Sequence, residues 1–296
     1  MPSPTQKRTD KQFGFDYRIV EYEKVHNTTD EEFNQLVAAV DPKPGQIILA
    51  GMDGYGSVTK WLLKKNMKEK TQPEIYVLDD SSVQLKRSED NIPTIDQKHR
   101  IQADIRETPF KNGTFDTVVI KMGVHEIPKE EQLKLFLEMN RILKPEGKLV
   151  IWELALDKET QNVFRDVIRM KDKLAGFDKL VQNRYFPRHD DLTRLFKKGG
   201  FIDVEDYYEF YPRLSTLVRK DELVSKEHKQ LENKNGTLTK EEEVQLKQLG
   251  KERAKLLTEY ARKRVPVELR KKMNYKDFGD DIQFSPKKII MLGYKR

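Results

Sequence analysis

Three glycines follow a short apolar run near the start of the chain. Residues 47–50 are rich in β-forming side chains, Gly51, Gly54 and Gly56 come next, and residues 58–65 favour a helix. Glycine has no Cβ, so the main chain of such a loop can lie directly against a ligand. The pattern predicts a strand, a ligand-binding loop and a helix, although a tight strand-to-helix connection would give the same pattern.

Carboxylates follow the next two predicted strands. Residues 74–78 end at Asp79 and Asp80, and residues 99–103 end at Asp104, which Ile105 follows. In a doubly wound sheet an acid after the second strand lies beside the first glycine loop, within reach of a ribose diol. Aspartate also caps helices, so one of the two neighbouring acids could cap while the other binds. We favour Asp79 as the ligand because it closes the strand.

Predicted helices and strands alternate through the first two thirds of the chain. Thr29 and Glu32 form a capping box that begins a helix, an amphipathic helix at 129–143 separates strands 115–120 and 148–153, and strands at 201–211 and 287–294 follow. This alternation favours an open α/β fold with a parallel sheet.

About 70 residues, 213–283, separate the last two strands. The pattern of this segment predicts one helix at 221–231 and a second helix that begins with a capping box at Thr239 and ends at Arg264. Leu246, Leu249, Leu256 and Tyr260 share a helical stripe, which could pack on its own domain or form a homodimer seam or a partner contact. Residues 266–273 are strongly basic. The predicted domains are an arm at 1–28, a core at 29–212, this helical insertion, and a final core strand at 284–296.

Composition narrows the class of protein. The chain has 296 residues and no cysteine, which excludes disulfides and thiolate metal sites and fits a reducing compartment. No apolar run approaches the roughly 20 residues that cross a bilayer, so we expect a cytoplasmic protein. The net charge of +7 belongs to the second half of the chain, where mixed-sign helices are usually solvated faces, so nucleic acid is an unlikely partner.

An ordered set of motifs resembles the class I S-adenosylmethionine-dependent methyltransferases, particularly the small-molecule type related to ubiquinone and menaquinone biosynthesis. The set comprises the glycine loop, Asp79, Asp104 with Pro109-Phe110, Phe115-Asp116, His125, Arg141-Ile-Leu-Lys-Pro-Glu-Gly-Lys148 and a strand that ends at Glu153. The resemblance implies a Rossmann-like seven-stranded sheet with its last strand antiparallel. It also implies S-adenosyl-L-methionine as cofactor and a small-molecule acceptor.

The resemblance also implies which residues would contact S-adenosyl-L-methionine. Gly51, Gly54 and Gly56 would lie against its methionine and adenosine parts, Asp79 would take the ribose hydroxyls, and Asp104 with the Ile105 backbone would meet the adenine. The chain departs from the family at Ala50, where an acid is usual, and at Met52, where the first loop glycine aligns. Asp53 could supply the missing carboxylate from within the loop.

His125 and Glu126 stand where a catalytic base would act. Methyl transfer needs a base only when the acceptor carries a proton, and the unperturbed pKa of histidine suits that task. His125 could equally pack against the cofactor. Tyr17, Tyr185 and His189 could line the acceptor pocket or be packing residues. The five histidines have no metal-ligand spacing, so no metal is expected.

Two other functions compete with methyl transfer to a small molecule. A non-catalytic binding or assembly protein could retain a degenerate methyltransferase fold. An RNA methyltransferase would account for the basic second half, but no amino-methylating motif such as Asn-Pro-Pro-Tyr follows the fourth strand.

Overall fold

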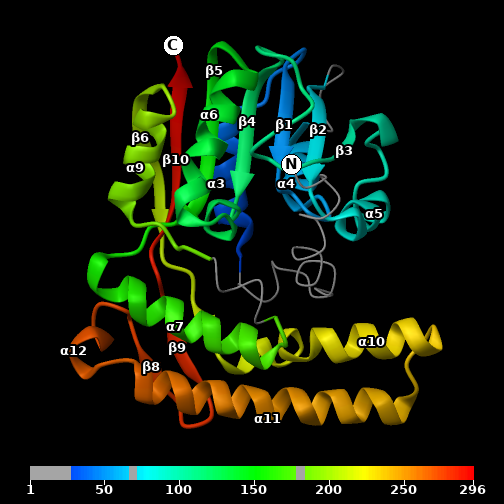
Figure 1. Ribbon diagram of the computed structural model, residues 1–296, viewed down its shortest axis with the longest axis vertical. Coiled ribbons are helices and arrows are strands. Elements are labelled where there is room, and N and C mark those ends of the chain that lie inside the picture. Colours follow the sequence, from blue (N-terminus) through cyan, green and yellow to red (C-terminus); the bar gives the residue numbers. More distant parts are fainter. Residues whose placement is uncertain (1–27, 67–71, 178–183) are drawn as a thin grey trace, which may run out of the picture. The chain divides into compact units, whose positions relative to one another are not determined.

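The computed structural model describes residues 28–66, 72–177 and 184–296 (Figure 1). Contacts divide the chain into two compact units, each described by itself below. The sheet unit comprises residues 29–155, 184–210 and 287–296, and the helical unit comprises the described part of residues 1–28, 156–183 and 211–286. Residues 156–183, placed in the core by the sequence analysis, therefore group with the inserted segment. Most of the predicted arm lies outside the described residues.

The sheet unit contains a seven-stranded sheet in the order β3-β2-β1-β4-β5-β10-β6. Strands β1 to β5 run parallel to one another, and β10 is antiparallel to both β5 and β6 (Figure 1). This topology confirms the predicted fold, including its antiparallel last strand. The strands are β1 (Ile47–Gly51), β2 (Glu74–Asp79), β3 (Arg100–Gln102), β4 (Phe115–Lys121), β5 (Leu143–Leu154), β6 (Phe201–Phe210) and β10 (Lys288–Lys295).

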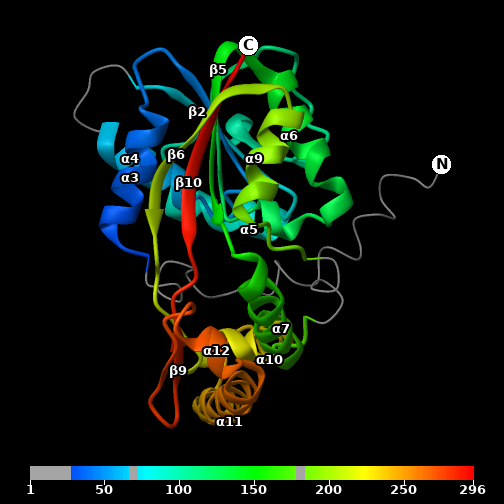
Figure 2. The same ribbon diagram turned by 90° about the vertical axis from the view of Figure 1, so that its left-hand side faces the viewer.

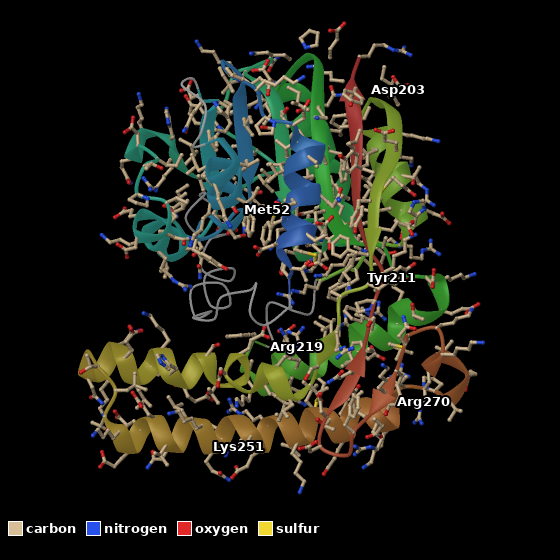
Figure 3. All side chains as sticks on the ribbon, turned by 180° about the vertical axis from the view of Figure 1, so that it is seen from behind. Met52, Asp203, Tyr211, Arg219, Lys251 and Arg270 are labelled. Carbon is tan, nitrogen blue, oxygen red and sulfur yellow. The ribbon has the colours of Figure 1, made fainter. Side chains whose placement is uncertain are left out.

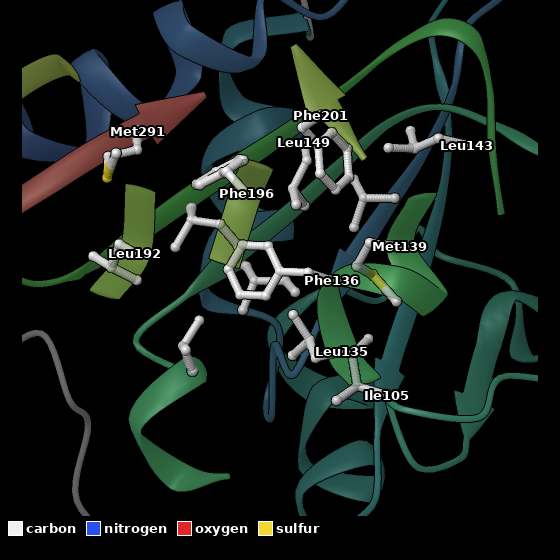
Figure 4. Close-up of a cluster of buried hydrophobic side chains, with 14 of the residues drawn as sticks. Ile105, Leu135, Phe136, Met139, Leu143, Leu149, Leu192, Phe196, Phe201 and Met291 are labelled. Carbon is white, nitrogen blue, oxygen red and sulfur yellow. The ribbon is translucent and has the colours of Figure 1, made fainter. Parts of the chain in front are cut away.

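Helices cover both faces of this sheet (Figure 2). On one face lie α3 (Asp30–Val40), α4 (Ser57–Asn66) and α5 (Ser82–Asn91), and on the other lie α6 (Gln132–Ile142) and α9 (His189–Lys198). A cluster of buried apolar side chains lies on each face, the first beneath α3, α4 and α5 and the second beneath α6 and α9. Because the side chains of a strand alternate between faces, Ile48 and Ala50 of β1 belong to the first cluster and Leu49 to the second. Figure 4 shows the second cluster, in which Phe136 and Phe196 meet edge to face. Burial of these apolar side chains holds the sheet between its two helical layers.

The strand predicted at 148–153 begins earlier, at Leu143, so it includes the Lys-Pro-Glu-Gly segment of the motif. Phe115 pairs with Leu143 but Thr117 pairs with Lys148, so residues 144–147 bulge out of the sheet. Lys144 Nζ lies 2.8 Å from Asp116 Oδ2, and that same oxygen accepts a hydrogen bond of 2.8 Å from the Ile47 backbone N–H. The motif therefore fixes the start of β1 against β4 and β5.

The helical unit is built around two long helices. It contains α7 (Lys158–Leu174), α10 (Ser225–Asn235), α11 (Lys240–Arg264), α12 (Val267–Arg270) and two short 3-10 turns, η4 (Leu217–Lys220) and η5 (Glu222–Val224). A small sheet in the order β7-β9-β8, formed by Leu214–Ser215, Ile282–Phe284 and Lys276–Asp277, is absent from the sequence prediction. None of the helices described in either unit is both long enough and apolar enough to span a membrane.

The predicted stripe on α11 is partly wrong. Its capping box at Thr239 is present, but Leu256 is 50% exposed, and the buried face runs through Leu246, Gly250, Ala254, Leu257 and Ala261. A β-carbon on Gly250 would lie 2.6 Å from the backbone oxygen of Lys220. The face that packs is therefore the one with small residues, because the backbone of η4 lies against it.

Candidate ligand site at the ends of the central strands

The order of the strands places a crevice beside β1. Strands β1 and β4 are neighbours, yet β1 leads to α4 on one face and β4 leads to α6 on the other. Ligands of open α/β sheets bind outside the carboxyl ends of the strands at such a switch point. Most of the predicted site residues follow β1, β2, β3 and β4 and are thus brought to this edge.

Only one of the three loop glycines could carry a β-carbon without a close contact. A β-carbon on Gly54, whose φ is +55°, would find no atom nearer than Asp79 Oδ2 at 3.9 Å. Gly51 and Gly56 instead accommodate packing, because β-carbons there would lie 2.8 Å from Ile105 Cδ1 and 2.6 Å from Ile92 Cδ1. Gly54 is therefore the loop position at which a ligand could approach the main chain.

Asp79 closes β2 and binds the glycine loop directly. Its Oδ2 accepts a 2.8 Å hydrogen bond from the Gly54 N–H, and its Oδ1 accepts one of 3.0 Å from the Ser81 N–H. The Ser81 hydroxyl, not either acid, caps α5 by accepting from the Gln84 N–H. Burial, together with the charge of Asp80, raises the pKa of Asp79 to about 7. A cation or a hydroxyl donor beside this buried carboxylate would stabilise its ionised form.

Asp53 has a structural task within the loop. Its carboxylate accepts hydrogen bonds from the backbone N–H of Val58 at 2.7 Å and from that of Thr59 at 3.0 Å, and from the Thr59 hydroxyl at 2.6 Å. These bonds satisfy free N–H groups at the start of α4. Burial raises the pKa of Asp53 to about 6 despite these bonds. Both of its oxygens accept hydrogen bonds from the start of the helix, and its predicted contact with the cofactor stays a prediction.

Asp104 and Ile105 lie next to Asp79 but are engaged by other protein groups. The Ala103 N–H donates to the backbone oxygen of Asp79 at 3.1 Å, which brings the ends of β2 and β3 together. Arg106 binds the Asp104 carboxylate through Nε at 2.8 Å and through its backbone N–H at 2.9 Å. The Ile105 side chain is buried against Gly51.

His125 is held between two carboxylates. Its Nδ1 lies 2.9 Å from Glu153 Oε1 and its Nε2 lies 3.1 Å from Glu126 Oε1, and Arg184 Nε binds Glu126 at 2.8 Å. The ring also stacks on Phe186. Burial alone would lower the pKa of His125, but the charges of Glu153 and Glu126 outweigh it and raise the pKa to about 9. Both ring nitrogens lie against carboxylates, and the raised pKa favours the protonated ring. The role of His125 as a base stays a prediction.

Met52 is a residue whose role the sequence analysis did not foresee. Met52 is labelled in Figure 3. Its φ of +56° lies in the left-handed region that glycine favours. Its side chain packs on Gly123, which follows β4. The sequence signal was present, because the first loop glycine of the resembling family aligns with this position.

Two of the predicted acceptor residues, Tyr185 and His189, form hydrogen bonds with other protein groups. The Tyr185 backbone N–H donates to the His125 oxygen at 3.2 Å, but its hydroxyl donates to Asp191 at 2.9 Å. His189 binds Asp206 at 2.7 Å on β6, the edge strand farthest from β3. Tyr17 lies outside the described residues. Across residues 28–66, 72–177 and 184–296, no three His, Asp or Glu side chains are arranged to hold a metal ion.

Comparisons with known proteins identify the same region. Residues 49–151 match the family model described as a methyltransferase domain. A demethylmenaquinone methyltransferase from Staphylococcus haemolyticus is 27% identical over 159 residues, which are 49% of this chain and 65% of that relative. A second one, from Staphylococcus aureus, is 28% identical over 145 residues, 44% of this chain and 58% of the relative. The chain thus spans less than two thirds of the length of these curated relatives.

Solved structures share the fold at low sequence identity. A candidate methyltransferase from Bacillus halodurans superposes with a TM-score of 0.64 and 15% identity, over 90% of this chain and 99% of that one. A phosphoethanolamine N-methyltransferase from Haemonchus contortus, solved with S-adenosylhomocysteine, has a TM-score of 0.50 and 17% identity, over 100% of this chain and 61% of that one. Together with the domain match, these similarities confirm the predicted resemblance to class I methyltransferases.

Proposed function

We propose, from the methyltransferase domain at residues 49–151 and its class I fold, that this protein transfers a methyl group from S-adenosyl-L-methionine to a small-molecule acceptor. The observation that carries the proposal is the bond between the Gly54 N–H and Asp79, which joins the open loop to the acid that ends β2. S-adenosylhomocysteine in the Haemonchus contortus structure supports the choice of donor.

The residues at the crevice fit a cationic donor that bears a ribose. Burial raises the pKa of Asp79, and the charges of Asp80 and, to a lesser extent, Asp53 raise it further, so a positive group beside the carboxylate would stabilise its ionised form. Asp79 would accept the ribose hydroxyls, and the bare main chain at Gly54 would lie against the methionine part. Asp80, Asp104 and the Ile105 backbone would border the adenine. When bound, S-adenosylmethionine would supply an electrophilic methyl group on its sulfonium.

His125 and Glu126 would position groups rather than remove a proton from the acceptor. Because the imidazolium bonds both Glu153 and Glu126, it ties the end of β5 to the turn after β4. Arg184 extends this network to the segment that carries Tyr185. A fixed wall beside the crevice would align an acceptor, and alignment can supply much of the acceleration of a direct displacement. Tyr17, Tyr185 and His189 remain proposed acceptor contacts.

Calorimetric titration with S-adenosylmethionine and S-adenosylhomocysteine tests the proposal. We expect saturable binding, and an affinity lowered by about tenfold or more in Asp79→Ala, as for a lost charge-assisted hydrogen bond. Asp90→Ala, at an exposed position on α5, is the matched control and should bind as the wild type does. Absence of heat and of any thermal shift with either compound would overturn the proposal.

Met52 and Ala50 favour one alternative. A loop whose first glycine position carries a side chain in a left-handed conformation is what a non-catalytic binding or assembly protein with a degenerate site would show. The same titration separates the two functions, because that protein would bind neither compound. A cytoplasmic location is part of our proposal and is supported by the cysteine-free composition. A homodimer or partner contact through the helical unit also remains a proposal.

A further inference from the structure

Most of the net charge of the chain is concentrated at one corner of the helical unit. Residues 262–276 contain seven Lys or Arg and one acidic residue, a net charge of +6 against +7 for the whole chain. They comprise the end of α11, the short helix α12 and the first residue of β8. The methyltransferase proposal assigns no task to this basic segment.

Hydrogen bonds and a cation–π contact hold these pieces against one another. Arg262 on α11 binds the Asp277 carboxylate of β8 through Nε at 2.7 Å, and the Arg270 guanidinium lies 4.6 Å from the centre of the Tyr275 ring. The Tyr275 N–H in turn donates to the Arg270 oxygen at 2.8 Å. The corner is therefore a fixed surface, with Arg270 on it and Lys251 farther along α11 (Figure 3). We call residues 262–278 the basic corner.

Several cations of the basic corner have no anionic partner among the residues that the structure describes. Arg262, Arg264 and Lys272 form ion pairs with Asp277, Asp166 and Glu159. In contrast, Lys263, Lys271 and Lys276 are exposed and form no ion pair with any residue in the described ranges. Three unpaired lysines and the Arg270 guanidinium present positive charge to an outside partner.

Two large apolar side chains stand among these cations. Val267 is 74% exposed at the start of α12, and Phe278 is 58% exposed at the turn after β8. A surface that binds only phosphates gains nothing from such exposure, whereas a lipid surface takes up both apolar side chains and the cations around them. Exposed apolar side chains among exposed cations therefore favour a membrane surface over a nucleic acid as the partner.

We propose that the basic corner docks the protein on anionic lipid surfaces, with Lys263, Lys271, Lys276 and Arg270 against the headgroups and Val267 and Phe278 inserted at the acyl boundary. The occupant is a bilayer that contains acidic phospholipid. This inference is independent of the methyltransferase proposal, because it uses no residue of the crevice.

Co-sedimentation with vesicles tests the docking. The full chain should bind vesicles of phosphatidylcholine mixed with phosphatidylglycerol and should not bind pure phosphatidylcholine. Each cation near such a surface is worth about fivefold in affinity, so Lys263→Glu/Lys271→Glu/Lys276→Glu should weaken binding by far more than tenfold and flatten its salt dependence. Lys234→Glu/Lys240→Glu/Lys251→Glu, an equal charge change at exposed positions of α10 and α11, should weaken it much less.

A second variant tests the apolar part. Val267→Ser/Phe278→Ser keeps the charge of the corner and alters only exposed positions, so it should fold normally, and we expect about tenfold weaker vesicle binding. The proposal is overturned if the wild type ignores the acidic vesicles, if both triple variants lose binding equally, or if the serine variant binds as the wild type does. Binding to an RNA homopolymer that is unaffected by the serine changes, with no vesicle binding, would assign the corner to nucleic acid instead.

Discussion

The side chain of Met52 fills the space that a β-carbon on Gly123 would occupy, since such a carbon would lie 2.7 Å from Met52 Sδ. The two residues follow the neighbouring strands β1 and β4. The methionine therefore reaches across the crevice where the proposed donor would bind. Its left-handed backbone costs about 1–2 kcal/mol in any residue other than glycine, Asn or Asp. The Met52 side chain therefore takes up space in the crevice, and its backbone conformation carries a strain that glycine would not.

Replacement of Met52 by glycine should strengthen donor binding. Overfilling a packed region costs about 1–3 kcal/mol, so we expect Met52→Gly to bind S-adenosylhomocysteine about tenfold more tightly in calorimetric titration. Met52→Leu keeps the Cβ and a similar volume and should bind as the wild type does. An affinity of Met52→Gly equal to or below that of the wild type would contradict this view of Met52.

The ion pairs of His125 should make the sheet unit less stable at alkaline pH. The pKa of about 9 in the folded protein exceeds the ordinary histidine value of 6.5, so the stabilisation is complete below pH 6.5 and is lost as the pH rises through about 9. The shift corresponds to about 3 kcal/mol at most. Urea unfolding followed by fluorescence reports on this unit alone, because Trp61 and Trp152 both lie in it.

Glu153→Gln provides the comparison for His125. It removes one of the two charges that raise the pKa, so its unfolding free energy should change less between pH 6 and pH 9.5 than that of the wild type. Glu209→Gln, on the edge strand β6, should retain the wild-type dependence on pH. If all three proteins show the same dependence, His125 is not the group that titrates.

Donor binding should strengthen as the pH rises through 7. Asp79 accepts hydroxyl donors best when ionised, and burial with the charge of Asp80 raises its pKa to about 7 in the free protein. Between pH 6 and pH 8 the ionised fraction rises about tenfold, and the affinity for S-adenosylmethionine should rise by the same factor. Asp79→Asn should bind weakly and without this dependence. A wild-type affinity that is equal at both pH values would exclude Asp79 as the ribose contact.

The sheet unit was predictable from sequence because local signals and burial agree there. The capping box at Thr29, the apolar strands and the glycine loop each favour one structure, and the sheet has seven strands with the last one antiparallel, as expected. The carboxylates at the strand ends were predictable for the same reason. Sequence could not show that Asp53 caps α4, because whether a loop acid points at a ligand or at a helix depends on the path of the backbone.

The helical unit was harder to predict because its packing is long-range. Leu256 fits a leucine stripe but lies on the exposed side, since Gly250 and Ala254 allow the backbone of η4 to approach. The two-residue strands β7 and β8 are too short to carry a pattern. The protonated state of His125 also depends on Glu153, a residue 28 positions away. Such features arise from contacts between distant segments and leave no local signature.

A buried charge network joins α7 to the 3-10 turns of the helical unit. Lys171 Nζ lies 2.5 Å from Glu222 Oε1 and 2.8 Å from Asp172 Oδ1, and Arg219 binds the other oxygen of Glu222 at 2.8 Å. All four side chains are almost fully buried, beside a cavity of about 10 Å³ that Lys171, Ser215, Thr216 and Arg219 help to line. A space of that size holds one water molecule. The two cations and the two carboxylates of this network carry equal and opposite charge, so each buried charge is stabilised by the others.

Removal of one cation from this network should destabilise the helical unit strongly. Lys171→Met removes the cation that contacts the buried carboxylates of both Asp172 and Glu222, and removal of one partner from a buried ion pair typically costs about 3–5 kcal/mol. Denaturation followed by far-UV circular dichroism should show the loss in the helical signal, while tryptophan fluorescence, confined to the sheet unit, should change less. Lys173→Met, at an exposed position of the same helix, should cost well under 1 kcal/mol. Equal stabilities of the two variants would mean that Lys171 is replaceable by an apolar side chain and that packing alone holds α7 in place.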